Sequence, residues 1–260
     1  MVQQLSLFGA IDDDSYSLFV STITTLSGNP PILFARLSTI WKPNPEYEIN
    51  NTNSKNQLVE KARINVSKTL SLNSFNLPES EIMDYNLLKT LPNDENTGII
   101  DSSRINEILQ SKDLSAWSFA ISDIPASASS NNRKVSVQNI SETVLLSSTG
   151  SSSNLTHFMN ELAYVSEFKY VTIGIKFNLK HNLIIELQKI WNVNDENSNT
   201  QITKGGFLIK AFINVAKATD VDKINHNESV LLNLQKELQG YVNLSIPDRS
   251  SMDSRMAYDI

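Results

Sequence analysis

Apolar and polar residues alternate along much of the chain with the period of two that indicates β-strands. Most of these apolar runs are short and bounded by turn residues, as strands are. The predicted strands are residues 3–8, 32–41, 63–70, 117–121, 135–146, 161–177, 183–191, 205–215 and 241–246. No helix is predicted between the strands from residue 116 to residue 215, which favours antiparallel pairing because parallel strands need long crossovers.

Two longer segments instead have helical spacing. The first begins at the acidic residues 12–14 and stops before Gly28, and the second begins at Asn227 and ends at Gly240. Acidic or amide residues at the start and glycine at the end are typical helix caps. A third, shorter helix is predicted at residues 103–109.

Several predicted strands carry apolar residues on both faces, so both faces need cover. Amphipathic helices can supply that cover. We therefore expect an α+β fold, mainly β, built as a closed or nearly closed antiparallel β-barrel with two or three packed helices outside; an open sandwich is the alternative. Residues 1–260 are expected to form a single domain, with a loop-rich and poorly readable region at residues 50–115.

The first predicted helix has an unusual surface, because hydroxyl residues replace the usual charged ones. Ser21, Thr22, Thr24 and Thr25 lie outside the face on which the apolar residues fall at helical spacing, namely Tyr16, Phe19, Val20, Ile23 and Leu26. β-Branched threonines are unfavourable in helices. Either tertiary packing holds a marginal helix, or the surface is shaped for a partner; Thr22 and Thr25 are the candidate contacts on its outward side.

Composition excludes several classes of protein. The net charge is −6 and the basic residues are dispersed, so the positive surface that direct nucleic-acid binding requires is missing. Cysteine is absent, which excludes disulfides and thiolate metal sites and suits the cytosol or nucleus. The first residues do not resemble a secretory signal, and no apolar run approaches the ~18 residues of a membrane span. Neither membrane nor nucleic acid is expected as a direct partner.

Catalytic patterns are weak. The three histidines lie far apart in sequence, and no glycine-rich phosphate loop is present. Glu46 and Glu48 are two residues apart, the spacing with which triphosphate tunnel enzymes hold a divalent metal on one strand. However, Asn50 stands where that pattern has lysine, and a proline-rich break precedes the pair. A metal-dependent triphosphate hydrolase of tunnel-barrel type is therefore kept only as the alternative function, and no cofactor is predicted.

The segment VTIGIKFNLKHNLIIELQKIW reads as two strands joined by a turn at His181 and Asn182. Lys176 lies on the more polar face of the first strand, and Glu186 and Gln188 on that of the second. These groups are expected to pair across the two strands in the barrel wall, where each pair contributes only about 0.2 to 1 kcal/mol.

Several long stretches together resemble the budding-yeast form of the Mediator subunit 18 family. They are MVQQLSLFG, SGNPPILF, WKPNP, WSFAISDIPA, VTIGIKF, HNLIIELQKIW, GGFLIKAFINV and KELQGYVNLSIPDRSSMDSRM. The resemblance covers residues 1–49 and 116–256 in order and with similar spacing, whereas residues 50–115 match weakly.

The resemblance implies a noncatalytic β-barrel subunit of the Mediator head module, similar to the triphosphate tunnel fold. It also implies pairing with subunit 20, binding of a C-terminal helix of subunit 8, contact with other head subunits and with the RNA polymerase II initiation machinery, and a nuclear location. The resemblance implies no catalytic residues in this chain. Charged residues near the C-terminus are a second candidate contact surface, with a solvated terminus as the alternative. These residues are Asp248, Arg249, Asp253 and Arg255.

Overall fold

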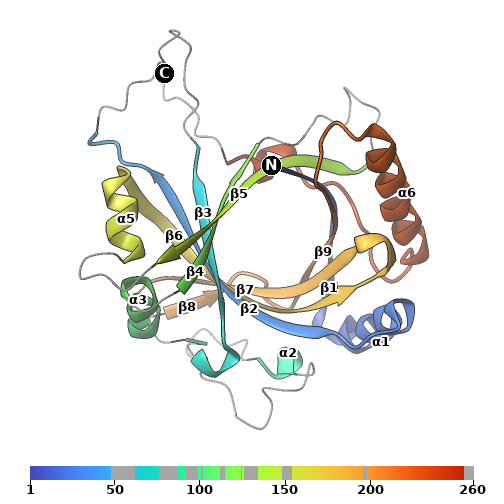
Figure 1. Ribbon diagram of the computed structural model, residues 1–260. Coiled ribbons are helices and arrows are strands. Elements are labelled where there is room, and N and C mark those ends of the chain that lie inside the picture. The colour runs from blue at the N-terminus through green and yellow to red at the C-terminus, as the bar shows by residue number, and fades with distance from the viewer. Residues whose placement is uncertain are drawn as a thin grey trace.

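Eight antiparallel strands close into a barrel in the computed structural model (Figure 1), which describes residues 1–47, 62–75, 87–91, 99–100, 102–111, 115–123, 125, 134–147, 154–195 and 198–254. The strands are β1 (Val2–Asp12), β2 (Ile32–Pro43), β3 (Ile64–Leu70), β4 (Ser115–Ser122), β5 (Ser136–Ser147), β6 (Tyr164–Asn178), β7 (Ile184–Asp195) and β9 (Gly206–Val215). Their order is β6-β2-β3-β4-β5-β1-β9-β7, and pairing of β6 with β7 closes the ring. The closed barrel confirms the predicted fold class.

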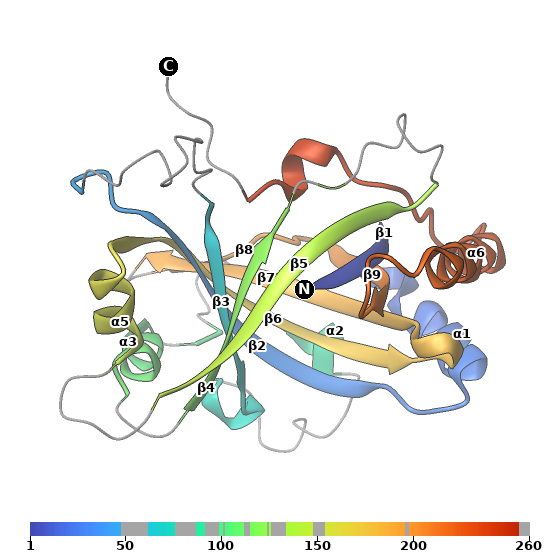
Figure 2. The same cartoon turned by 45° about the horizontal axis from the view of Figure 1, so that its top comes forward.

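Helices cover the outside of this barrel in two groups, as Figures 1 and 2 both show. On one side lie α1 (Tyr16–Ser27) and α6 (Val221–Glu237), and on the other lie α3 (Ser102–Gln110) and α5 (Leu155–Glu161). The described ranges also contain the short α2 (Leu87–Thr90) and strand β8 (Ser198–Gln201), which pairs with β7. None of the helices in the described ranges is long and apolar enough to span a membrane.

The register separates an outer from an inner face of the wall. Leu5 pairs with Ile213 and Leu7 with Ala211, and all four are buried in the main apolar cluster. The helices pack on this face, since the rings of Tyr16 on α1 and Phe207 on β9 lie 4.8 Å apart. The alternate positions therefore face the inside of the barrel, and they are markedly more polar.

One ion pair fastens the start of α1 to the outer face of the barrel. The 3-10 turn at Asp13–Ser15 precedes the helix, and a carboxylate oxygen of Asp13 lies 2.9 Å from Nζ of Lys189 on β7. The Lys189 side chain has no exposed surface, and its ammonium group lies 4.6 Å from the centre of the Phe207 ring. The helix ends as predicted at Gly28, whose φ of 68° is the left-handed conformation that glycine adopts without strain.

The sequence reading placed several element boundaries incorrectly. Residues 155–161 form α5, whereas a strand was predicted from residue 161 and no helix before it. Residues 192–200 were predicted as a loop, but β7 continues to Asp195 and β8 follows at Ser198. Both strands are held by pairing with each other, which local sequence does not encode.

The last helix and the last strand also differ from their predictions. Helix α6 begins at Val221 with Asp220 as its cap, seven residues before the predicted cap Asn227, which is instead a buried residue within the helix. Residues 241–246 were predicted as a strand, but only one bridge, between Ser245 and Phe8, joins this segment to the sheet. The region 50–115 was expected to be loop-rich, and its described parts contain the predicted strand β3 and helix α3.

Candidate interaction surfaces

The outward face of α1 carries an apolar stripe. Leu18 and Leu26 are 59% and 42% exposed, and Thr22 and Thr25 lie between them on the same face. Each threonine hydroxyl donates to the carbonyl four residues earlier, Thr22 to Leu18 at 2.8 Å and Thr25 to Ser21 at 2.9 Å. These donors are used within the helix. Because α1 also contains no charged residue, it offers a partner mainly apolar contact.

A groove continues from this stripe toward α6. It has a volume of about 330 Å³, and Leu26 marks its end on α1. Leucine and valine side chains form most of its lining, with charged groups among them. The lining residues are Leu26, Leu179, Lys180, His181, Leu183, Val230, Asn233, Leu234 and Glu237. The stripe and the groove together form one apolar surface, which we call the α1–α6 surface.

The C-terminal segment, residues 248–254, lies across one mouth of the barrel. Nε2 of Gln138 on β5 donates to the carbonyl of Met252 at 2.9 Å, and the backbone N–H of Arg63 donates to the carbonyl of Ser254 at 2.7 Å. Ser254 donates through its hydroxyl to the carbonyl of Ser122 on β4. This segment therefore packs on its own barrel rather than being entirely solvated.

The candidate residues in this segment have different environments. Asp248 is exposed, whereas Asp253 is half-buried. The pKa of Arg63 is raised mainly by its hydrogen bond to Glu167, and the negative charge of Asp253 adds a smaller effect in the same direction. Arg255 lies outside the described residues, and for Arg249 only the backbone is described, in the 3-10 turn Arg249–Met252. Thr22 and Thr25 lie on α1, which stands apart from the C-terminal 3-10 turn in both Figures 1 and 2, so the candidates form two surfaces rather than one site.

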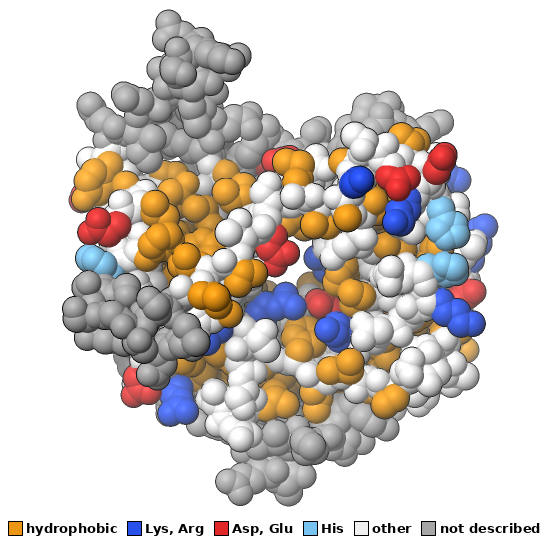
Figure 3. Space-filling model, viewed as in Figure 1, with side chains coloured by type: hydrophobic (Ala, Val, Ile, Leu, Met, Phe, Trp, Pro, Cys, Tyr) orange, Lys and Arg blue, Asp and Glu red, His pale blue; other side chains and the backbone are white. Residues whose placement is uncertain are grey.

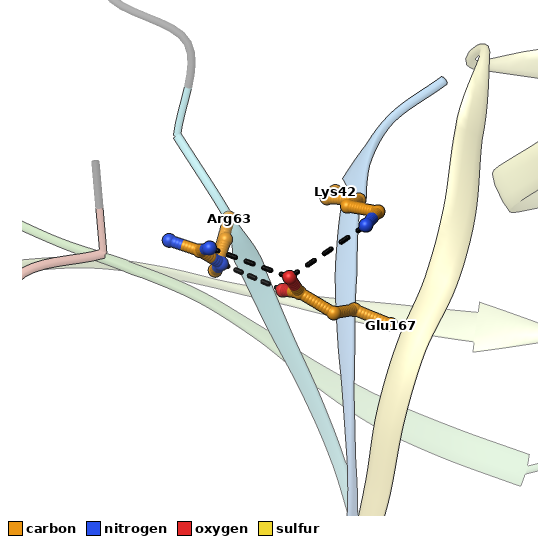
Figure 4. A network of polar contacts seen from close by, with 3 residues as sticks. All are labelled: Lys42, Arg63 and Glu167. Carbon is orange, nitrogen blue, oxygen red and sulfur yellow. Dashed lines mark hydrogen bonds and ion pairs between the residues drawn. The ribbon is translucent and has the colours of Figure 1, made fainter. Parts of the chain in front are cut away.

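A small cluster of charges joins β2, β3 and β6 beside this segment (Figure 4). Arg63 donates through Nε and Nη2 to the two carboxylate oxygens of Glu167, at 2.6 and 3.3 Å, and Nζ of Lys42 lies 3.8 Å from one of them. The hydrogen bond from Arg63 holds the pKa of Glu167 below its usual range, and the same bond raises the pKa of Arg63. The bidentate pair ties the start of β3 to β6 across β2.

Glu167→Gln is expected to lower the free energy of unfolding at neutral pH and to make that free energy less sensitive to acid. Because the folded pKa of Glu167 is lowered, its contribution is present above the ordinary pKa of a glutamate and is lost as the pH falls through the folded value. The pair is partly exposed, so the loss is about 1 kcal/mol at neutral pH. Urea unfolding at pH 7 and pH 3 measures it: the difference between wild type and variant should be smaller at the lower pH, and a constant difference would contradict the assignment.

The inner wall carries the charges on which the hydrolase alternative depends. The predicted cross-strand pairing is confirmed, since Lys176 faces Glu186 and Gly174 faces Gln188. Glu46, however, is exposed in the turn after β2, where its backbone N–H donates to Asn44 at 3.0 Å. Glu48 and Asn50 lie outside the described residues. The described part of the Glu46–Asn50 pattern is thus a turn and not a strand of the inner wall.

The histidines remain separate from acidic clusters. His157 lies 3.7 Å from Glu161 on α5, and His181 and His226 contact each other with ring centres 5.2 Å apart. Among the described residues, no three histidine, aspartate or glutamate side chains are placed to hold a metal ion.

The fold is a helix-covered β-barrel that carries two candidate contact surfaces. The family model described as Med18 protein matches residues 3–255, including the region 50–115 where the resemblance is weak. Mediator of RNA polymerase II transcription subunit 18 from Saccharomyces cerevisiae is 48% identical, over 99% of this chain and 98% of that protein. Its Kluyveromyces lactis counterpart is 44% identical over 98% of each chain. The chain therefore belongs to the Mediator subunit 18 family, whose members are transcription coactivator subunits and not enzymes.

A solved structure supports the fold independently of sequence. A chain in the structure of the Schizosaccharomyces pombe Mediator head module superposes with a TM-score of 0.61, covering 94% of this chain and 98% of that one, at 12% identity. At that identity the likeness establishes a common fold, so the predicted barrel is confirmed. The predicted family is confirmed by the family model and the relatives above.

Sequence reasoning missed some residues of these surfaces. Leu18 and Leu26 lie four residues from Thr22 on either side, and this spacing, together with the absence of charge on the helix, was the available indication. The role of Met252 at the barrel mouth had no such indication, because its contacts come from Ser136 and Gln138 on β5, more than 100 residues away.

Proposed function

We propose that this protein is a noncatalytic subunit of the Mediator head module that pairs with subunit 20 and holds a C-terminal helix of subunit 8. In this role it acts in the nucleus and supports RNA polymerase II initiation and its regulation through protein contacts. Membership of the Mediator subunit 18 family carries the proposal. The uncharged stripe on α1 supports it, because an apolar helix face on an acidic protein is suited to a partner.

Purification of the tagged chain from nuclear extract at moderate salt tests the proposed partners. Subunits 20 and 8 are expected to co-elute in constant proportion, together with other head subunits. Elution of the chain alone would contradict the pairing. A subunit 8 lacking its C-terminal helix provides the matched control, since it is expected to be lost from the complex while subunit 20 remains.

The stripe on α1 is further proposed as a contact for the transcription machinery. Introducing charge with Thr22→Lys and Thr25→Lys is expected to weaken polymerase association about tenfold or more, because a contact surface would have to bury two ammonium groups. Ser17→Lys is the control, since Ser17 is exposed on the same helix but lies away from the stripe. Unchanged polymerase association of a folded double variant would overturn this contact.

The charged residues near the C-terminus are proposed as a second contact. Asp248 is exposed, and Asp253 lies close enough to Arg63 to raise its pKa, so a partner that pairs with Asp253 must compete with Arg63. Arg249 and Arg255 are proposed to contribute cations to the same contact. This region is independent of the α1–α6 surface, and the two can be tested separately.

A further inference from the structure

Three cations and one carboxylate meet on the inner wall of the barrel. Glu186 on β7 pairs directly with Lys176 on β6 and with Lys210 on β9, so it lies between two lysines on neighbouring strands. Nη2 of Arg36, which reaches over from β2, lies 3.5 Å from its carboxylate. All four residues occupy inward positions of the register. One carboxylate therefore faces three positive charges.

Lys210 is the least compensated of these cations. Its ammonium lies over the rings of Phe212 and Phe8, at 4.9 and 5.8 Å from their centres, and no carboxylate of the described residues lies within 4.0 Å of it. The barrel walls surround it, although part of the residue's surface remains open toward the inside. Burial lowers the pKa of Lys210 to about 8; Glu186 opposes this effect and Arg36 adds to it. The positive charge at this place thus exceeds what Glu186 can balance.

The inside of the barrel has open space near this charge. Figure 3 shows a central hollow with Lys or Arg and Asp or Glu side chains on its walls.

We propose that the inner wall binds a small oxyanion of the sulfate or phosphate type, held by Arg36, Lys176 and Lys210. An anion there balances the excess charge, and charge-assisted hydrogen bonds from guanidinium and ammonium groups are the usual means of holding it. Binding requires no hydrolysis and no metal. The site is also independent of the proposed Mediator partners, because it lies inside the barrel and away from the α1–α6 surface.

Calorimetric titration of the purified full chain with sodium sulfate tests the site, with sodium chloride at matched ionic strength as the reference. Sulfate is the first probe because it keeps its charge across the relevant pH range. Binding is expected to weaken about tenfold between pH 7 and pH 9, as a lysine with a pKa of about 8 loses its proton. The charged groups facing Lys210 are Glu186 on β7 and Arg36 on β2, with Lys176 beyond Glu186, while β1 contributes the uncharged Phe8.

Three variants make the result specific. Lys210→Met is expected to lower sulfate affinity at least tenfold, Lys210→Arg to keep affinity but lose the decline above pH 8, and the exposed Lys217→Met to behave as wild type. If Lys210→Met does not fold, Lys176→Met replaces it with the same expectation. Heat effects identical to those of chloride, or unchanged affinity in a folded variant, would overturn the proposal. A phosphoserine peptide that binds more tightly than free phosphate would overturn the assignment to a free anion.

Discussion

Asp13→Ala is expected to lower the free energy of unfolding by about 3 to 5 kcal/mol, the range for removing one partner of a buried ion pair. The reason is that the two partners of this ion pair differ in their exposure to water. Lys189 has no exposed side-chain surface, whereas 31% of the Asp13 side chain is exposed. Removing the carboxylate takes a counter-charge away from an ammonium that water cannot reach, and the contact with Phe207 offsets only part of the loss.

The reverse replacement is expected to be milder. Lys189→Met keeps an apolar side chain of similar length in the buried position, and Asp13 can be hydrated, so about 1 to 2 kcal/mol is lost. The double variant is expected to be close to Lys189→Met alone. Guanidinium unfolding measures the free energy of unfolding of all three variants, provided that its dependence on denaturant concentration is the same in each. Equal losses for the two single variants, or strictly additive losses in the double variant, would show that the buried ammonium does not dominate.

Gly174→Ala is expected to cost about 2 to 3 kcal/mol, although alanine is the smallest possible addition. A Cβ at this inward position of β6 would lie 2.5 Å from the carbonyl oxygen of Leu187 and 2.9 Å from Cζ of Phe34. The backbone of β7 cannot move away without disturbing the ring of strands, so the overlap causes strain. Thermal unfolding monitored by circular dichroism measures the loss.

Gly28→Ala provides the comparison, because it tests conformation without crowding. A Cβ there meets nothing within 4 Å, and the cost of about 1 kcal/mol comes from the left-handed backbone alone. Phe34→Leu in the Gly174→Ala background is expected to recover only the part caused by the ring. A Gly174→Ala variant as stable as Gly28→Ala would mean that the wall adjusts easily, contrary to the closed register.

The barrel could be predicted because each strand is marked by its own alternation of apolar and polar residues. The segment from Val171 to Trp191 alternates clearly, and its turn at His181 and its pairing of Lys176 with Glu186 were predicted and found. Helix α1 was equally readable, from its acidic start to Gly28.

Other features depended on contacts that sequence does not show. Asn227 looks like a helix cap, but tertiary packing buries it within α6, and the true cap is Asp220. Helix α5 was missed although Asn154 caps it, because seven residues contain too little periodicity. Arg36, Lys176 and Lys210 come together inside the barrel only because the ring closes. Pairing of β6 with β7 places β2, which carries Arg36, near β9, which carries Lys210.

Closure of the ring also has a mechanical consequence. Each of its eight strands has a hydrogen-bonded neighbour on both sides, and in the described part of the chain only β8 pairs on one side alone. A second protein therefore cannot add a strand between neighbours in the ring, and apart from the one free edge of β8 it must recognise side chains on the outside. Because no strand can slide without moving its neighbours, α1 and α6 on one side keep a constant distance from α3 and α5 on the other (Figure 1). The barrel acts as a stiff spacer, so two proteins bound on opposite sides hold a fixed mutual orientation.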